Sequence, residues 1–242
     1  MRPTDVDISN EPTQARTTVE SIAQRLREDI LSGRYPPEAR LPTEELRQRY
    51  GVGASTVREA LSRLMSESLV TAVGQRGFRV APMSIRDFQE ISALRKLLEC
   101  KALRKSIMVG DDEWEANLVA RYYTLSKIEK QLRQHASLDD SDRARELVQR
   151  WSQANEEFHN ALVAACGNSW LMRIRRLLHS QSHRYIRLSL TSAGTNRDVH
   201  EEHRAIYQAA LDRDADEACR LIEAHIDNTV NIVIDKLRSK GF

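Results

Sequence analysis

The sequence is poor in the residues that most often interrupt regular structure. Its 242 residues include only 9 glycines and 6 prolines. An all-β protein with many tight turns needs more of both, so the composition favours a helix-rich fold. The three cysteines, Cys100, Cys166 and Cys219, are far apart and show neither CxxC nor zinc-ribbon spacing. They indicate free thiols in a reducing compartment rather than a disulfide framework.

Long apolar runs are also missing. No stretch approaches 18 uninterrupted apolar residues, and the start of the sequence has no apolar signal-peptide segment. We therefore expect a cytoplasmic protein without a membrane partner. The 37 Lys and Arg residues nearly balance the 35 Asp and Glu residues, and the net charge of +2 says nothing by itself about partners. A nucleic-acid-binding protein can concentrate its basic residues in one segment.

What the sequence does contain is 40% apolar residues, enough to fill sizeable cores, and 30% charged residues. Residues 1–16 are polar and aperiodic, and we expect a flexible tail there. Three short helical patterns follow, the first from Thr17 and the third over about 55–68. Two short segments then surround a glycine-flanked loop, which predicts a hairpin. Three helices and a hairpin are typical of a winged helix-turn-helix domain, expected over residues 17–82.

After Pro82 and Met83 the apolar pattern is helical to the end of the chain, with no sign of a strand or a short repeat. We expect an all-helical antiparallel bundle over residues 83–242, and so a mainly α protein with two domains. The expected helices span 84–108, 112–135, 139–166, 168–190, 197–213 and 214–238.

The N-terminal domain contains a candidate DNA-reading segment. In a helix-turn-helix, one helix crosses the phosphate backbone and the N-terminal residues of the next enter the major groove. Arg58, one turn into the second helix, could donate two hydrogen bonds to a guanine. Residues 46–80 hold six arginines and only two acidic residues, Glu59 and Glu67. The predicted DNA-contacting residues are Arg47, Arg49, Ser55, Thr56, Arg58 and Arg63, with Gln75, Arg76 and Gly77 at the wing tip.

Residues 17–81 resemble the DNA-binding domain of the GntR family of bacterial transcription regulators. Glu44 and Ala54 stand where that family often has arginines that contact DNA. The resemblance therefore implies that Arg58 carries more of the base readout and that the operator differs from the familiar one. The matching segments are Leu41-Pro42, Leu46, Gly51-Val52, Val57-Arg58-Glu59-Ala60-Leu61 and Gly77-Phe78-Arg79-Val80.

Three histidines of the C-terminal part form a second constellation. Asn155 and His159 are four residues apart on one expected helix, so both face the same way. His203 and His225 fall on the last two expected helices. Antiparallel packing of these helices could place the two histidines side by side. Three imidazoles with one oxygen donor suit Zn²⁺ or Ni²⁺. From spacing alone, a structural role for each histidine is the more common outcome.

Residues 84–238 are similar to the FCD effector-binding domain of the FadR subfamily. The metal motif of that domain is Asp-x-x-x-His, followed by one histidine on each of the last two helices. The resemblance implies a divalent metal site, with Zn²⁺ expected and Ni²⁺ as the alternative. Asn155 replaces the usual aspartate, and a neutral amide oxygen is a weaker donor than a carboxylate. The implied ligands are Asn155, His159, His203 and His225.

The segments 110–116 and 125–129 resemble the carbon-starvation-induced, dicarboxylate-responsive repressor branch of these regulators. The resemblance implies a small organic acid effector. Arginine presents a planar fork that suits a carboxylate. Arg95 occupies a position that faces the pocket in the family. The predicted effector-binding residues are Arg95 and, on the helix expected to close the other side, Arg184, Tyr185 and Arg187.

These features predict a ligand-responsive transcription regulator that binds operator DNA as a homodimer and is not an enzyme. The resemblance implies a repressor, although some members of the subfamily activate. One alternative keeps DNA binding but limits the bundle to dimerisation and metal-based stability. Another is a metal-dependent hydrolase with glutamates near an open metal position. Against the hydrolase, His200-Glu201-Glu202-His203 does not have the HExxH spacing.

Overall fold

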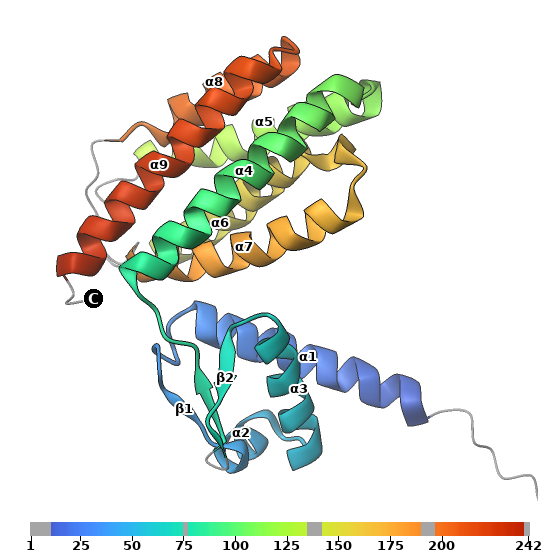
Figure 1. Cartoon of the computed structure of the whole chain (residues 1–242), viewed down its shortest axis with the longest axis vertical. Coiled ribbons are helices and arrows are strands. Elements are labelled where there is room, and N and C mark those ends of the chain that lie inside the picture. Colours follow the sequence, from blue (N-terminus) through green and yellow to red (C-terminus); the bar gives the residue numbers. More distant parts are fainter. Residues whose placement is uncertain (1–10, 75–76, 135–141, 190–196, 240–242) are drawn as a thin grey trace, which may run out of the picture. The chain divides into compact units, whose positions relative to one another are not determined.

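The computed structural model describes residues 11–74, 77–134, 142–189 and 197–239 (Figure 1). The chain divides into two units. The first comprises Met1–Phe88, Ser180–Ser192 and Lys236–Phe242, and the second comprises Gln89–His179 and Ala193–Asp235. Helices dominate both units, which confirms the mainly α prediction.

The first unit contains the winged helix-turn-helix domain. Apolar side chains of its three helices form one buried cluster, in which Leu26, Leu61 and Leu64 are fully buried. Gly51 ends α2 in the left-handed conformation (φ 67°), which glycine adopts without a steric penalty. The three strands form one antiparallel sheet in the order β1-β3-β2. The elements are α1 Glu11–Leu31, β1 Arg40–Leu41, α2 Thr43–Tyr50, α3 Ala54–Ser66, β2 Val70–Ala72 and β3 Phe78–Val80.

Two features of this unit differ from the prediction. Strand β1 was not predicted, because two residues are too few to show an alternating pattern. Helix α1 begins at Glu11 rather than at Thr17, so the prediction of a tail is wrong for residues 11–16. Pro12 lies in the first turn of α1, where a missing N–H costs nothing. The rest of the predicted tail lies outside the described residues.

The remaining helices form the antiparallel bundle, and each end lies within four residues of its predicted position. Lys96 of α4 pairs with Asp227 of α9 at 2.7 Å, and Arg104 pairs with Asp216 at 2.6 Å. This register makes α4 and α9 antiparallel neighbours, side by side in Figure 1. The elements are α4 Ile85–Val109, α5 Asp112–Gln134, α6 Asp142–Leu162, α7 Ser169–Ser189, α8 Val199–Leu211 and α9 Ala215–Ser239, with a 3₁₀ turn η2 at Ala164–Cys166.

The turn between α4 and α5 depends on a close approach at Gly110. A Cβ atom there would lie 2.5 Å from the Trp114 ring and 2.7 Å from the Ser106 carbonyl oxygen. Trp114 is 4% exposed, and its indole N–H donates to the Ala161 carbonyl of α6 at 2.9 Å. The glycine therefore lets α5 dock on α6 through a buried, hydrogen-bonded tryptophan.

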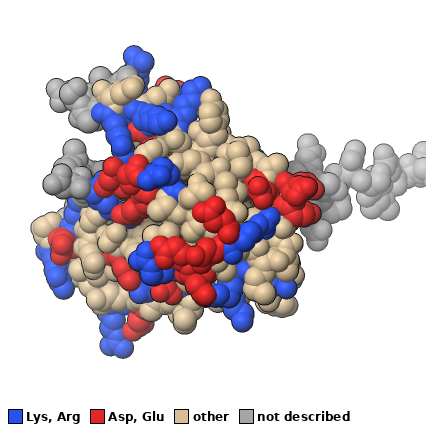
Figure 2. Space-filling view, turned by 90° about the horizontal axis from the view of Figure 1, so that it is seen from above, with Lys and Arg blue, Asp and Glu red and all other residues tan. Residues whose placement is uncertain are grey.

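Acidic and basic side chains are interspersed on the face drawn in Figure 2. Among the described residues, none of the helices combines the length and the apolar character that crossing a bilayer requires.

Candidate metal centre and DNA-reading surface

Three helices of the bundle each contribute one buried histidine to a single cluster. His159 comes from α6, His203 from α8 and His225 from α9, and they are 2%, 0% and 8% exposed. The ring centroids lie 4.8–5.4 Å apart. One nitrogen from each ring can be chosen so that all three lie within 4.8 Å of one another. We call these residues the histidine triad.

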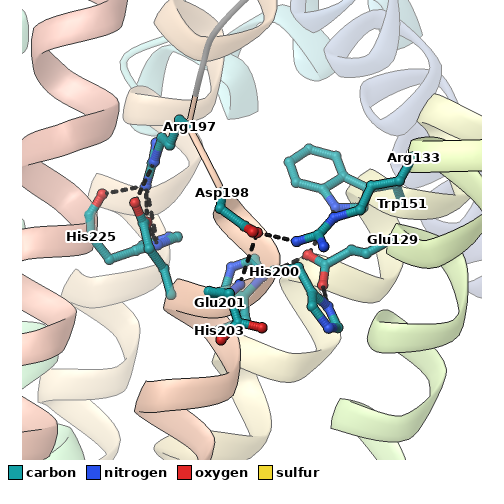
Figure 3. Close-up of polar contacts among 10 residues, drawn as sticks. Glu129, Arg133, Trp151, Arg197, Asp198, His200, Glu201, His203 and His225 are labelled. Carbon is teal, nitrogen blue, oxygen red and sulfur yellow. Dashed lines mark hydrogen bonds and ion pairs between the residues drawn. The ribbon is translucent and has the colours of Figure 1, made fainter. Parts of the chain in front are cut away.

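A buried glutamate holds His203 from the side away from the triad. Nδ1 of His203 lies 2.7 Å from Oε1 of Glu129, a residue of α5 that is 4% exposed (Figure 3). The other oxygen of Glu129 lies 2.8 Å from Nδ1 of His200, and the Trp151 indole donates to Oε1 at 3.3 Å. Nε2 of His203 is buried and has no hydrogen-bond partner among the described residues.

His225 has a similar arrangement with a different carboxylate. Its Nδ1 lies 2.8 Å from Oε2 of Glu202 on α8. Arg197 binds Glu202, with Nε donating to Oε1 at 2.7 Å. It also donates to the His225 carbonyl at 2.9 Å (Figure 3), and the same guanidinium lies 3.2 Å from Nδ1 of His225. Asn228 adds a hydrogen bond to Oε1 of Glu202 at 3.0 Å. The ring nitrogen Nδ1 and the backbone carbonyl of His225 are therefore held by the same small network.

The electrostatics of the cluster favour neutral imidazoles at His159 and His225 and ionised carboxylates at Glu129 and Glu202. Burial, assisted by the neighbouring imidazoles and Arg95, holds the pKa of His159 well below its usual value. Burial also lowers the pKa of His225 to about 4, although the hydrogen bond to Glu202 opposes this. Burial alone would raise the pKa of Glu129, but hydrogen bonds from His203, His200 and Trp151 outweigh it and keep the pKa below its usual value. Neutral imidazole is the form that binds metals.

The residues of the triad fit a divalent cation. A buried Nε2 without a partner is uncommon, because an unsatisfied polar atom in the interior is costly. A metal ion would accept its lone pair. Asn155 is half-buried and lies one turn before His159 on α6, where its side chain shares the face of that histidine. Three nitrogen donors with a nearby amide oxygen are typical of zinc or nickel rather than of magnesium or calcium.

Arg95 lies beside the triad, as its predicted role requires. It is 7% exposed, and its charge contributes to the lowered pKa of His159. Nε of Arg95 lies 3.6 Å from Oε1 of Glu99 on the same helix. The other oxygen of Glu99 accepts a 2.8 Å hydrogen bond from Arg175, which also donates to the His159 carbonyl. Two buried guanidinium groups thus share one carboxylate next to the triad.

The other predicted effector-binding residues have different surroundings. Arg184 donates to the Ala81 carbonyl at 2.7 Å, and the Tyr185 hydroxyl donates to Asp87. The described hydrogen bonds of both residues therefore lie within the first unit, at the segment that follows β3. Arg187 belongs to α7, but its side chain lies outside the described residues. Effector contacts by these three residues stay a prediction.

The N-terminus of α3 is arranged as the DNA-reading prediction requires. Ser55 and Arg58 are exposed and Thr56 is half-buried. The N-cap, Gly53, makes no side-chain capping hydrogen bond to the helix. The first N–H groups of α3 are therefore available to an anion such as a phosphate.

The other predicted DNA-contacting arginines already have partners within the domain. Arg47 donates two hydrogen bonds to Glu44, at 3.0 and 2.6 Å. Arg49 donates to the Tyr35 hydroxyl at 3.3 Å, and Arg63 lies 3.7 Å from Glu59. At the wing tip, Gly77 has the left-handed conformation (φ 93°), while Gln75 and Arg76 lie outside the described residues.

Sequence reasoning missed the residues that surround the triad: Glu129, Arg175, Arg197, His200 and Glu202. Except for Arg197 and Glu202, which bind each other five residues apart, their contacts join distant parts of the chain; Glu129 and His203, for example, are separated by 74 positions. The one available signal was the single glutamate in the apolar stripe of the helix that contains Leu125 and Ile128. A carboxylate at a core position must have a partner.

Comparison with known families agrees with both units. Residues 18–80 match the family of bacterial regulatory proteins of the gntR type, and residues 90–228 match the FCD domain. The chain belongs to the GntR family of bacterial transcription regulators and has a C-terminal FCD domain. Its relatives are DNA-binding regulators and not enzymes, so the hydrolase alternative is wrong.

The chain is similar to regulators over most of its length. It is 41% identical to the HTH-type transcriptional regulator BphR of Paraburkholderia xenovorans, over 90% of this chain and 86% of BphR. It is 33% identical to the HTH-type transcriptional repressor GlaR of Escherichia coli, over 86% of this chain and 92% of GlaR. Among solved structures, E. coli McbR/YncC shares the fold with a TM-score of 0.73 at 18% identity, covering 91% of this chain and 98% of that one.

Proposed function

We propose that this GntR-family regulator is a ligand-responsive repressor that binds operator DNA as a homodimer and holds a divalent metal and a small carboxylate effector in its bundle. The observation that carries the proposal is the convergence of three buried imidazoles in a chain that also has a winged helix-turn-helix. Two relatives named as repressors support the sign of regulation: GlaR, and NanR of Klebsiella aerogenes at 25% identity.

In this proposal α3 reads the operator. Ser55 and Thr56 meet phosphate oxygens at the helix N-terminus, and Arg58 reads a guanine in the major groove. Exposure of Arg58 and the open N-terminus of α3 support these roles. The supporting contacts are assigned to Arg47, Arg49 and Arg63 around α3 and to Gln75, Arg76 and Gly77 at the wing.

The metal is held by His159, His203 and His225, with Asn155 as an oxygen donor. The ion, Zn²⁺ or Ni²⁺, would supply a positive charge and an open coordination position for a ligand oxygen. Arg95 then provides a second cationic group beside the triad. A carboxylate is the ligand that best matches a metal ion and a buried guanidinium together.

A homodimer would present two recognition helices to two half-sites of an operator. Exposed apolar side chains on the bundle supply candidate contacts for it. Leu94 and Leu97 of α4 are 54% and 66% exposed, and Trp170 and Ile174 of α7 are 67% and 45% exposed. Large apolar side chains exposed in this way are typical of surfaces that bind a partner.

One observation favours a second candidate, in which the metal only stabilises the bundle. All three histidines are at most 8% exposed, and structural zinc sites are closed in this manner. In that case the bundle would serve for dimerisation and stability without an effector.

Thermal unfolding with a panel of small carboxylates, with and without a chelator, separates the two candidates. A true effector at a hundredfold excess over its Kd should stabilise the protein by about 2.7 kcal/mol. It should also release a labelled operator fragment in the same concentration range. Stabilisation by metal alone, with no response of DNA binding to any carboxylate, would support the closed structural site instead.

A further inference from the structure

Two of the three histidines of the triad have a glutamate at Nδ1. Nδ1 of His203 faces Glu129 at 2.7 Å, and Nδ1 of His225 faces Glu202 at 2.8 Å. An ionised carboxylate only accepts hydrogen bonds, so Nδ1 of His203 must carry the proton. Nδ1 of His225 also lies 3.2 Å from the Arg197 guanidinium, which only donates, and we assign the proton there from the shorter contact to Glu202. The lone pair of each imidazole is then on Nε2, and the Nε2 of His203 is the buried atom without a partner.

We propose that Glu129 and Glu202 are positioning residues, which hold His203 and His225 in the Nδ1–H tautomer so that their Nε2 atoms serve as metal donors. This inference rests on the proposed metal site. A metal-binding histidine commonly donates its other N–H to a carboxylate, which fixes the orientation of the ring and raises the basicity of the ligand. Figure 3 draws Glu129 together with His203 and His200, whose Nδ1 atoms lie 2.7 and 2.8 Å from its two oxygens.

The two glutamates differ in their own partners. Glu202 is bound by Arg197, so a guanidinium offsets its negative charge. The described hydrogen bonds of Glu129 come from the imidazoles of His203 and His200 and from the Trp151 indole, none of which needs to be charged. Glu129 therefore brings to the interior beside the triad a negative charge with no arginine or lysine among its described hydrogen-bond partners.

That charge matters because the proposed ligands are all neutral. Three imidazoles and the Asn155 amide offer no negative charge to a dication, whereas an aspartate in place of Asn155 would offer one. Glu129 is 4% exposed, so water screens its field weakly. We assign to Glu129 the greater part of the compensation of the metal's positive charge. We therefore expect its loss to weaken metal binding more than the loss of Glu202 does.

Zinc affinity of matched variants tests this ranking. Metal-free full-length protein is titrated with zinc against a chromophoric chelator for the wild type, Glu129→Gln, Glu202→Gln and Glu201→Gln. Glu129→Gln should weaken binding by about 10–100-fold, as is usual when such a partner is lost, and Glu202→Gln by less. The control, Glu201, lies next to Glu202 on α8 and pairs with the exposed Arg204. Its substitution should leave the affinity unchanged.

A second readout needs no metal, and its main result needs no variant. Long-range ¹H–¹⁵N NMR of metal-free protein, with ¹⁵N-labelled histidine, reports the tautomer of each ring. His203 and His225 should be in the Nδ1–H form, and Glu129→Gln should change the signals of His203 and His200 but not that of His225. An Nε2–H tautomer of His203 in the wild type overturns the proposal, even if Glu129→Gln fails to fold. Equal zinc affinity of folded Glu129→Gln and wild type overturns it as well.

The two proposals fail in different ways. If the wild-type protein binds neither zinc nor nickel, the proposed metal site is wrong, and with it the assignment of Glu129 and Glu202 as positioning residues. If the wild type binds metal and the glutamate variants match it in affinity and tautomer, only the positioning role is wrong.

Discussion

The two units of this protein use polar side chains in opposite ways. In the winged helix-turn-helix, Ser55 and Arg58 are exposed at the start of α3. In the bundle, His203, Arg175 and Glu129 are 0%, 1% and 4% exposed. An exposed arginine can meet a partner that arrives through solvent, whereas a buried charged group must find its partner within the fold. One unit therefore presents its chemistry in a continuous motif, and the other assembles it from several helices.

The largest expected effect is on the metal centre. Replacing both His203 and His225 by alanine removes two of three imidazole donors, so metal content should fall from roughly one ion per chain to the background level. Elemental analysis of purified, untagged protein measures this. His183→Ala, on α7 outside the triad, is the control and should retain the wild-type content. Equal content in the double variant would refute the assigned ligands.

The buried ion pair should show the next largest effect. Arg175→Ala leaves Glu99 in the interior without its 2.8 Å partner, which should lower the free energy of unfolding by about 3–5 kcal/mol. Urea unfolding of metal-free protein measures the difference. Arg220 on α9 pairs with Glu217 at the surface, and Arg220→Ala should cause no measurable change. If both variants have the same free energy of unfolding, the buried Arg175 contributes no more to stability than the exposed Arg220.

For the DNA-binding unit the expected loss is smaller and confined to specificity. Arg58→Ala should remove about 1–3 kcal/mol of discrimination between operator and unrelated DNA, because a bidentate contact to guanine is lost. Fluorescence anisotropy with both DNAs at one salt concentration measures it, with Arg220→Ala again as the control. The unfolding midpoint should not move, since Arg58 is exposed. Unchanged discrimination would exclude Arg58 from base readout.

The smallest expected effect concerns Glu44, which holds Arg47 with two hydrogen bonds. Glu44→Gln should free Arg47 to neutralise one more phosphate. The slope of log affinity against log salt should then steepen by about 0.9, with tighter DNA binding at low salt. Measuring affinity at several salt concentrations checks this. An unchanged slope would show that Arg47 makes the same phosphate contacts in the wild type and in Glu44→Gln.

Local patterns in the sequence predicted most of the fold. Helices of the bundle were placed to within four residues, because their apolar positions repeat with the helical period over many turns. The sequence pattern did not predict strand β1, because its two residues form a strand only by pairing with β3. Arg40 pairs with Arg79, and Leu41 pairs with Phe78. Helix α1 extends back to Glu11 although its first residues have no apolar stripe.

The candidate site was predicted only in part. The triad follows from helical spacing together with a family resemblance, and Arg95 was placed beside it by the same resemblance. Neither could indicate Glu129, whose contact with His203 spans 74 positions. Nor could they show that the hydrogen bonds of Arg184 would go to the Ala81 carbonyl. Such contacts depend on which faces of distant helices meet.

The sequence by itself determined the helical class, the winged helix-turn-helix and the residue types available to bind DNA and metal. These depend on short-range physics: backbone propensity, apolar periodicity and the geometry of glycine turns. Only the tertiary structure decided that Glu129 faces His203, that Glu202 faces His225 and that Arg175 binds one oxygen of Glu99. A polar group inside the protein depends on the particular partner that packing places next to it, and packing is a property of the whole bundle.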